Sequence, residues 1–275
     1  MINVCYSGNK KIFEGLLLAV LSLARVTQEE LKVHILTMDL HDENPNFLPF
    51  SDEQIALLDK IVKEKNPNSK VVKIDVTKEY VQELRDGKNH HNGYTPYATL
   101  RLLLDLVPNM PDKMIYMDID TMCVSNIKQL DDVDIERYDF GATKDYMGRF
   151  WINRHYCNSG VMTMNLKQIK ENGLFVKCRR KVNKTKMLMP DQTALNKYGK
   201  KKYLPFKFNE QRKIKEDTVV KHFCKGIVFF LPFGMHIYNI KQWQREKVHK
   251  SLKIFRFDDL YERVDQLKID YPECF

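Results

Sequence analysis

The chain has few cysteines, and their spacing does not suggest metal binding or a disulfide framework. Its six cysteines in 275 residues include no CxxC pair, and most lie within apolar stretches. Cysteines distributed in this way are typical of buried, reduced thiols. We therefore expect neither a structural zinc site nor a disulfide-rich secreted fold, and the pattern is that of a cytosolic protein.

Long apolar runs and repeats are also missing. The apolar run at residues 16–24 is too short to cross a bilayer. A signal peptide is not expected there, because Glu14 and Gly15 precede the run and a strand-like segment at residues 2–6 comes before them. The run instead predicts a buried helix. No internal repeat or low-complexity linker divides the chain.

Acidic residues are fewer than basic ones, 36 against 45, and the basic excess lies in the second half of the chain, at residues 177–186, 200–202 and 212–215. Such runs are most often solvated faces, but they also suit a polyanionic partner such as a phosphorylated donor. No RNP-like motif, zinc-finger spacing or helix-turn-helix pattern accompanies them, so nucleic acid is not expected. A peripheral contact with the anionic inner face of the membrane stays open.

What the sequence does contain is an alternation of strand and helix patterns. The predicted strands lie at residues 2–6, 32–37, 71–76, 113–120, 138–143 and 158–165. The predicted helices lie at residues 13–24, 51–62, 97–106, 166–177 and 191–198, with a polar loop at 87–93. This alternation favours an α/β fold with a mostly parallel sheet covered by helices on both faces.

The last residues of the chain have a different pattern. From Trp243 onward, charged residues are mixed with apolar ones such as Val248, Leu260 and Val264. We interpret residues 1–242 as one domain and residues 243–275 as a helical appendage packed on its outside.

Two carboxylates at the end of an apolar strand pattern are the strongest chemical signal. Asp118 and Asp120 are separated by Ile119, so alternation on a strand would place both carboxylates on one face. Open α/β sheets bind ligands beyond the carboxyl ends of their strands, and paired carboxylates suit a divalent cation. The alternative is a solvated polar strand end.

Several segments, taken in order, resemble the retaining glycosyltransferases of family 8, the glycogenin and lipopolysaccharide galactosyltransferase type. The matching segments are residues 2–9, 97–106, 113–130, 141–145, 156–166, 191–196, 204–209 and 220–224. The resemblance implies a GT-A fold, a Rossmann-like mixed sheet. It also implies Mn²⁺ or Mg²⁺ as cofactor and transfer of a hexose from a UDP-sugar to a hydroxyl acceptor, such as a cell-surface glycan or glycolipid.

The resemblance implies a metal site made of three residues. Asp118 and Asp120 match the DxD motif of the family, and His222 falls where the family supplies its third protein ligand. Two carboxylates and an imidazole suit Mn²⁺. Without the resemblance, His222 would be interpreted as a structural histidine.

The resemblance also implies a set of donor contacts. These residues are Cys5, Tyr6, Ser7, Asn9, Arg101, Asp118, Ile119, Asp120, Asp145, Asn158 and Lys225. Arg101 has the spacing of the donor-binding arginine of the family, and its alternative is an exposed helix residue. Asp145 and Asn158 match positions that contact sugar hydroxyls.

Two departures from the family pattern affect this set. Ser7 and Gly8 stand where many members have an acidic pair. The Lys-Pro-Trp that grips the diphosphate does not follow His222 at the usual distance, and Lys225 is the predicted substitute.

Asp191 and Gln192 match the DQ dipeptide of the family and are the predicted catalytic residues. An amide is a poor nucleophile, so a front-face mechanism is as plausible as double displacement. Gln192 would then stabilise positive charge at the anomeric carbon. The alternative for Asp191 is a helix N-cap, and both roles are compatible.

Two other functions fit parts of the pattern. A phosphatase with an aspartyl nucleophile also uses DxDxT, but that motif normally opens its fold, whereas three strand and helix units precede Asp118 here. A non-catalytic protein that binds sugar nucleotides would keep the fold without turnover.

Overall fold

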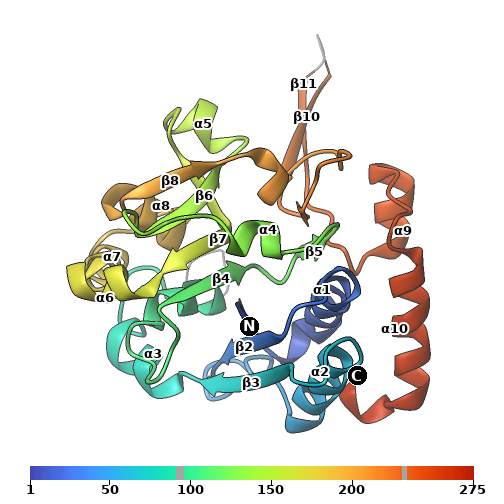
Figure 1. Ribbon diagram of the computed structural model, residues 1–275. Helices are drawn as coiled ribbons and strands as arrows, with labels where there is room; N and C mark the ends of the chain where they lie inside the picture. Colours follow the sequence, from blue (N-terminus) through green and yellow to red (C-terminus); the bar gives the residue numbers. More distant parts are fainter. Residues whose placement is uncertain (91–95, 231–233) are drawn as a thin grey trace.

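A seven-stranded mixed sheet forms the centre of the computed structural model, which describes residues 1–90, 96–230 and 234–275 (Figure 1). In spatial order its strands are β3 (Lys70–Asp75), β2 (Leu31–Thr37), β1 (Ile2–Ser7), β4 (Lys113–Met117), β7 (Cys157–Asn165), β6 (Phe140–Lys144) and β8 (Lys201–Leu204). Strand β7 is antiparallel to both neighbours, and the other pairs are parallel. The predicted mixed, mostly parallel sheet is confirmed.

Each face of the sheet has its own hydrophobic core. In β1, Val4 and Tyr6 belong to one core and Cys5 to the other, as alternation on a strand requires. One core receives α1 (Phe13–Val26), α2 (Asp52–Lys63) and α10 (Asp258–Asp270). The other receives α3 (Thr77–Glu83), α6 (Leu166–Asn172), α7 (Leu174–Lys184) and α8 (Pro190–Tyr198). Helices therefore cover both faces, as predicted.

The apolar run at residues 16–24 lies inside α1 and is buried, as predicted. Helix α2 begins with a capping box: the Ser51 hydroxyl accepts the Gln54 amide at 3.2 Å, and the Gln54 side chain accepts the Ser51 amide at 3.1 Å. Across the described residues, no helix is both long and apolar enough to span a membrane.

Two predicted helices differ from the structure. Residues 97–106 do not form an α-helix but a 3₁₀ helix, η2 (Pro96–Leu103), in which the Thr99 hydroxyl donates to the Pro96 carbonyl three residues back at 2.8 Å. The single helix predicted at 166–177 is two helices, because Gly173 adopts a left-handed conformation (φ 65°) that ends α6 and precedes α7. Of the loop predicted at 87–93, residues 91–93 lie outside the described part.

Two smaller sheets complete the fold. Strand β5 (Thr121–Cys123) pairs with β9 (Val220–His222), and β10 (Gly226–Phe230) pairs with β11 (Gly234–Tyr238) as a hairpin that projects from the body (Figure 1). The chain then returns through α9 (Arg245–Lys247) to α10, which lies along α1 on the outside of the molecule. The domain boundary after residue 242 stays a prediction.

We predict that Gly173→Ala lowers stability by about 1 kcal/mol, because an alanine is strained at positive φ. A Cβ at Gly173 would meet nothing within 4 Å, so the cost is conformational rather than steric. The melting temperature should fall by about 2–4 °C, measured by scanning calorimetry. Gly173→Asn is the matched control and should lose less, since asparagine tolerates this conformation. Equal losses in the two variants would contradict this explanation.

Candidate active site

The DxD segment lies where β4 ends and β5 begins. Strand β4 stops at Met117, so Asp118 and Asp120 belong to a turn rather than to the strand predicted through them. Ile119 is nevertheless buried between them, as alternation predicted. Pairing of Thr121 in β5 with His222 in β9 brings the histidine next to both carboxylates.

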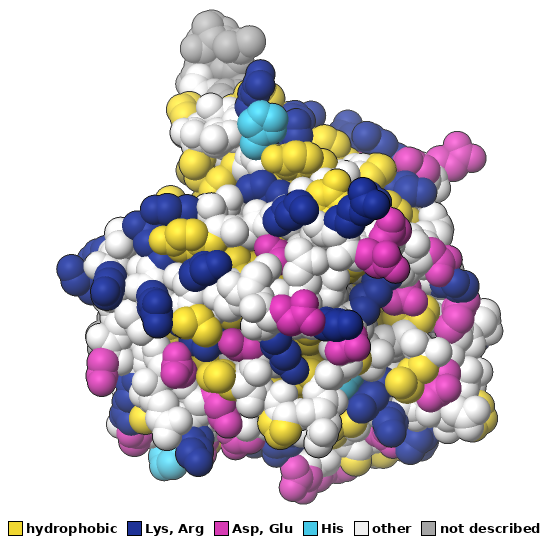
Figure 2. Space-filling model, turned by 60° about the vertical axis from the view of Figure 1, so that its left-hand side comes forward, with side chains coloured by type: hydrophobic (Ala, Val, Ile, Leu, Met, Phe, Trp, Pro, Cys, Tyr) yellow, Lys and Arg dark blue, Asp and Glu magenta, His cyan; other side chains and the backbone are white. Residues whose placement is uncertain are grey.

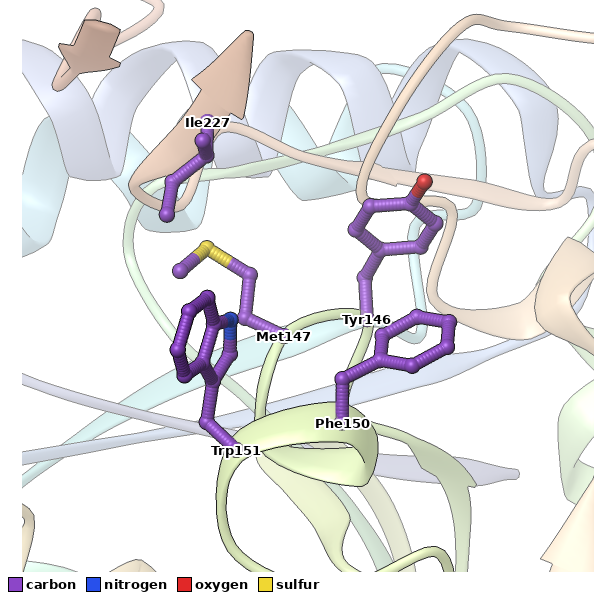
Figure 3. Close-up of a pocket in the computed structure, with 5 residues that line it drawn as sticks. All are labelled: Tyr146, Met147, Phe150, Trp151 and Ile227. Atoms are coloured by element: carbon purple, nitrogen blue, oxygen red, sulfur yellow. The ribbon is translucent and has the colours of Figure 1, made fainter. Parts of the chain in front are cut away.

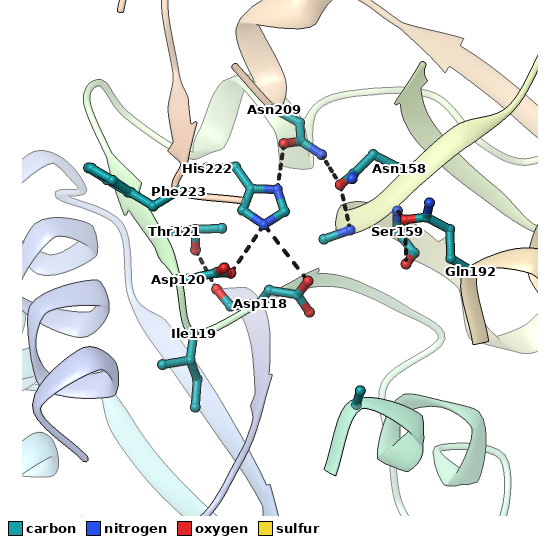
Figure 4. Close-up of polar contacts among 12 residues, drawn as sticks. Asp118, Ile119, Asp120, Thr121, Asn158, Ser159, Gln192, Asn209, His222 and Phe223 are labelled. Carbon is teal, nitrogen blue, oxygen red and sulfur yellow. Dashed lines mark hydrogen bonds and ion pairs between the residues drawn. The ribbon is translucent and has the colours of Figure 1, made fainter. Parts of the chain in front are cut away.

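Asp118, Asp120 and His222 converge at one point (Figure 4). One potential ligand atom from each lies within 4.8 Å of the other two. The Nε2 atom of His222 is 3.1 Å from Asp120 Oδ1 and 3.9 Å from Asp118 Oδ2. Two carboxylate oxygens and an imidazole nitrogen are a donor set that fits a divalent ion such as Mn²⁺ or Mg²⁺.

The orientation of His222 is set by an amide that the sequence reasoning missed. Asn209 Nδ2 donates to Asn158 Oδ1 at 2.9 Å, so the carbonyl oxygen of Asn209 faces His222 Nδ1 at 3.0 Å. This oxygen can only accept, so the hydrogen bond places a proton on Nδ1, and Nε2 is the ring nitrogen that faces the carboxylates. Metal-binding histidines typically have such a partner on the second nitrogen.

A glycine is required where β7 passes this cluster. A Cβ on Gly160 would lie 2.2 Å from His222 Cε1 and 2.8 Å from Asp118 Oδ2. Both contacts are shorter than van der Waals separation. Any side chain at Gly160 would therefore push apart the residues that converge here.

Arg101 is buried and connects the DxD segment to the DQ dipeptide. Its guanidinium donates to Asp118 Oδ1 at 2.6 Å and lies 3.3 Å from Asp191 Oδ2. Burial lowers the pKa of Arg101. The negative charge of Asp118, with smaller contributions from Tyr116 and Asp191, raises this pKa by a larger amount, so the guanidinium stays charged. The alternative of an exposed helix residue is wrong.

Lys241, which was not predicted from the sequence, forms an ion pair with Asp120 Oδ2. Its Nζ also donates to the Phe223 carbonyl at 3.2 Å. Burial raises the pKa of Asp120, but Lys241 and His222 together lower it well below its usual range. Asp120 is therefore ionised at neutral pH.

The sequence around Lys241 resembles the expected motif, but it lies farther from His222 than the motif was expected to lie. Residues 241–243 read Lys-Gln-Trp, close to the Lys-Pro-Trp expected after His222, but the β10–β11 hairpin separates the two. Gln242 Nε2 donates to the Ile119 carbonyl at 2.6 Å, which holds this segment against the DxD turn. Lys225 is exposed at the start of the hairpin, and its donor role stays a prediction.

The DQ dipeptide lies in the first turn of α8 and faces β7. Gln192 Oε1 accepts the Ser159 amide at 3.0 Å, and Gln192 Nε2 donates to Asp145 Oδ2 at 3.2 Å. Burial raises the pKa of Asp191, and Arg101 opposes this effect. The N-cap of α8 is Met189, so the alternative role of Asp191 as N-cap is wrong.

Asp145 completes a chain of hydrogen bonds from the candidate metal cluster to the candidate catalytic amide. Figure 4 shows the first part of this chain, from His222 through Asn209 to Asn158. Asn158 Nδ2 donates to Asp145 Oδ2 at 2.9 Å, and the same oxygen accepts Gln192. The order of the chain is His222, Asn209, Asn158, Asp145 and Gln192. These polar groups are buried and ordered, which suits recognition of sugar hydroxyls.

The predicted donor contacts in β1 differ in what they can offer. The side chains of Cys5 and Tyr6 are fully buried, so only their backbone groups could reach a ligand. The Ser7 hydroxyl is 2.6 Å from the Tyr116 hydroxyl, and Asn9 Nδ2 donates to the Asn46 carbonyl at 3.2 Å. Their donor roles stay predictions.

Comparisons with known proteins agree with this geometry. The sequence model of the family "Glycosyl transferase family 8" matches residues 3–229. A Haemophilus influenzae protein provisionally named a glycosyltransferase is 24% identical over 249 residues, which cover 81% of this chain and 71% of that protein.

Solved structures share the fold. The galactosyltransferase LgtC, in complex with donor and acceptor sugar analogues, is similar with a TM-score of 0.64 and 16% identity over 100% of both chains. The glycosyltransferase GlyE of Streptococcus pneumoniae gives a TM-score of 0.64 and 15% identity over 96% of this chain, which spans only 63% of GlyE. From the family match, supported by this likeness of fold, the chain belongs to glycosyltransferase family 8.

Proposed function

We propose that this glycosyltransferase moves a hexose, glucose or galactose, from a UDP-sugar to a hydroxyl of a cell-surface glycan or glycolipid, with retention of configuration and dependence on Mn²⁺ or Mg²⁺. The observation that carries the proposal is the convergence of Asp118, Asp120 and the oriented Nε2 of His222. We place the reaction in the cytoplasm, with basic segments near the inner face of the membrane.

When bound, the metal ion would neutralise charge that grows on the leaving diphosphate. Asp118, Asp120 and His222 would hold it. The ammonium group of Lys241 forms an ion pair with Asp120. When the donor binds, this group would bind a diphosphate oxygen in place of the carboxylate, which is the role predicted for Lys225. The hydrogen bond from Arg101 orients Asp118.

Transfer breaks the bond between the anomeric carbon and the diphosphate oxygen, and a new bond forms from that carbon to the acceptor oxygen. In a front-face reaction the acceptor proton passes to the leaving diphosphate. Asp145 and Asn158 would hold sugar hydroxyls, and the Gln192 carbonyl would stabilise positive charge at the anomeric carbon.

Hydrolysis of the UDP-sugar or transfer from it would distinguish this enzyme from a non-catalytic binding protein. A lack of phosphate release from monoesters would separate it from a phosphatase.

We predict that Asp120→Asn abolishes Mn²⁺-dependent binding of UDP-glucose, because the change removes a charged ligand and keeps the shape. Isothermal titration calorimetry with and without Mn²⁺ measures the effect, and circular dichroism checks the fold. Asp112→Asn, an exposed residue just before β4, is the matched control and should bind normally. Normal Mn²⁺-dependent binding by Asp120→Asn would remove this residue from the metal site.

We predict that Lys241→Ala weakens donor binding about tenfold or more, and that Lys225→Ala does so much less. A charged hydrogen bond contributes about 1.5–3 kcal/mol, and Lys241 lies at the candidate metal cluster whereas Lys225 is exposed. Calorimetric titration with UDP, which carries the diphosphate of the donor, measures the dissociation constant of each variant. The reverse order would assign the diphosphate to Lys225.

We predict that Gln192→Ala lowers kcat more than it raises the donor KM, because its contact strengthens as charge develops at the anomeric carbon. Initial rates give both constants, and proton NMR of the first product should show an α linkage from a UDP-α-sugar. Gln266→Ala, on the exposed face of α10, is the control. A β-linked product would overturn the retaining mechanism, and an unchanged kcat would move the stabilising group elsewhere.

A further inference from the structure

Directly after Asp145, the chain exposes an unusual group of aromatic side chains. Helix α5 (Gly148–Trp151) carries Phe150 and Trp151, whose exposed fractions are 71% and 67%. With Tyr146, Met147 and Ile227 of β10, they line a hollow of about 280 Å³ (Figure 3). Large side chains exposed together in this way typically mark a binding surface.

The hollow is fixed to the candidate sugar site. Asp145 Oδ1 accepts the backbone amides of Met147 at 3.0 Å and Gly148 at 2.6 Å. The other oxygen of Asp145 binds Asn158 and Gln192. One carboxylate therefore positions both the hollow and the predicted contacts to the transferred sugar.

Two arginines beside the hollow have their guanidinium groups against the Tyr146 ring, and the nearby carboxylate of Glu210 accepts the backbone amide of Arg212, at 2.8 Å. The guanidinium carbon of Arg149 is 4.9 Å from the Tyr146 ring centroid, and that of Arg212 is 4.6 Å from the same centroid. Among residues 1–90, 96–230 and 234–275, neither side chain makes an ion pair, and Arg149 Nε is buried without a hydrogen-bond partner. Burying such a donor is unfavourable unless a ligand satisfies it.

The segment that carries Arg212 is held in place. Gln211 accepts the Tyr146 amide at 2.7 Å and donates to the Lys144 carbonyl at 3.0 Å. Near the projecting hairpin, the surface shows lysine and arginine side chains next to hydrophobic ones (Figure 2). A ligand that fits must combine a flat apolar face with negative charge.

On the basis of the proposed function, we propose that this hollow is the acceptor site and that the acceptor is an acidic saccharide, with a phosphate or carboxylate group. The apolar face of a sugar ring would pack on Trp151, and the anionic group would bind Arg149 and Arg212. The size is close to the lower limit of small-molecule sites, about 300 Å³, and suits one ring rather than a lipid chain.

The test measures binding without a donor, by quenching of Trp151 fluorescence with glucose 6-phosphate, glucose and inorganic phosphate as probes. A Trp151→Phe variant identifies the signal. We expect glucose 6-phosphate to bind about tenfold tighter than glucose, which corresponds to about 1.4 kcal/mol, and also tighter than phosphate. The preference should decrease with added salt.

Arg149→Gln combined with Arg212→Gln should remove this preference. Arg149→Lys should keep part of it, since the charge remains, and Lys213→Gln, an exposed neighbour of Arg212, is the control that should keep all of it. Circular dichroism verifies that each variant is folded.

Three results of the titrations would overturn the proposal: equal binding of glucose and glucose 6-phosphate, phosphate binding as tight as glucose 6-phosphate, or a preference that survives loss of both arginines. Co-sedimentation with phosphatidylglycerol vesicles that requires both arginines would also overturn it, because the occupant would then be a membrane. Donor binding to the unmodified protein, measured separately, tests the proposed function itself. If the donor did not bind, the titration with glucose 6-phosphate would still test the acidic-saccharide site by itself.

Discussion

The architecture of the site depends on how two neighbouring carboxylates are neutralised at the end of a buried strand. Like charges this close repel strongly where little water screens them. Arg101 approaches Asp118 from one side, Lys241 approaches Asp120 from the other, and His222 lies between the two carboxylates. Each partner comes from a different part of the chain, so folding of the whole domain is needed to assemble the charge balance. A divalent cation would add to this balance at its centre.

A second constraint is that the polar groups behind this cluster are buried and must satisfy one another. The chain of amides and carboxylates from His222 to Gln192 does so with almost no water-facing member. Such a network is costly to rearrange, because a displaced member would leave its neighbour without a partner. The candidate metal cluster and the DQ dipeptide are therefore held at a fixed relation before any ligand binds, which is the preorganisation that transfer chemistry needs.

The elements of the fold and the site residues that belong to a periodic sequence pattern could be predicted, whereas isolated residues could not. Strand and helix periodicity predicted the sheet, and the strand end identified Asp118 and Asp120, although the strand stops one residue before the first of them. His222 lies 102 residues after Asp120, and only the family resemblance connected them. Asn209 leaves no periodic signal, because an amide in a short loop acts through individual side-chain hydrogen bonds, here to Asn158 and His222. Lys241 was missed because the β10–β11 hairpin separates it from His222 in the sequence.

That hairpin has a consequence for how such enzymes diversify. Its two ends are held beside the same turn: the Phe223 amide donates to the Asp120 carbonyl at 2.8 Å, and Lys241 returns to the Phe223 carbonyl. When the ends of a loop are fixed close together, doubling its length costs only about 0.6 kcal/mol. Natural selection could therefore lengthen, shorten or replace this segment while the chemistry at its base stays intact. The length and sequence of the hairpin can therefore change with little effect on the charge balance at its base.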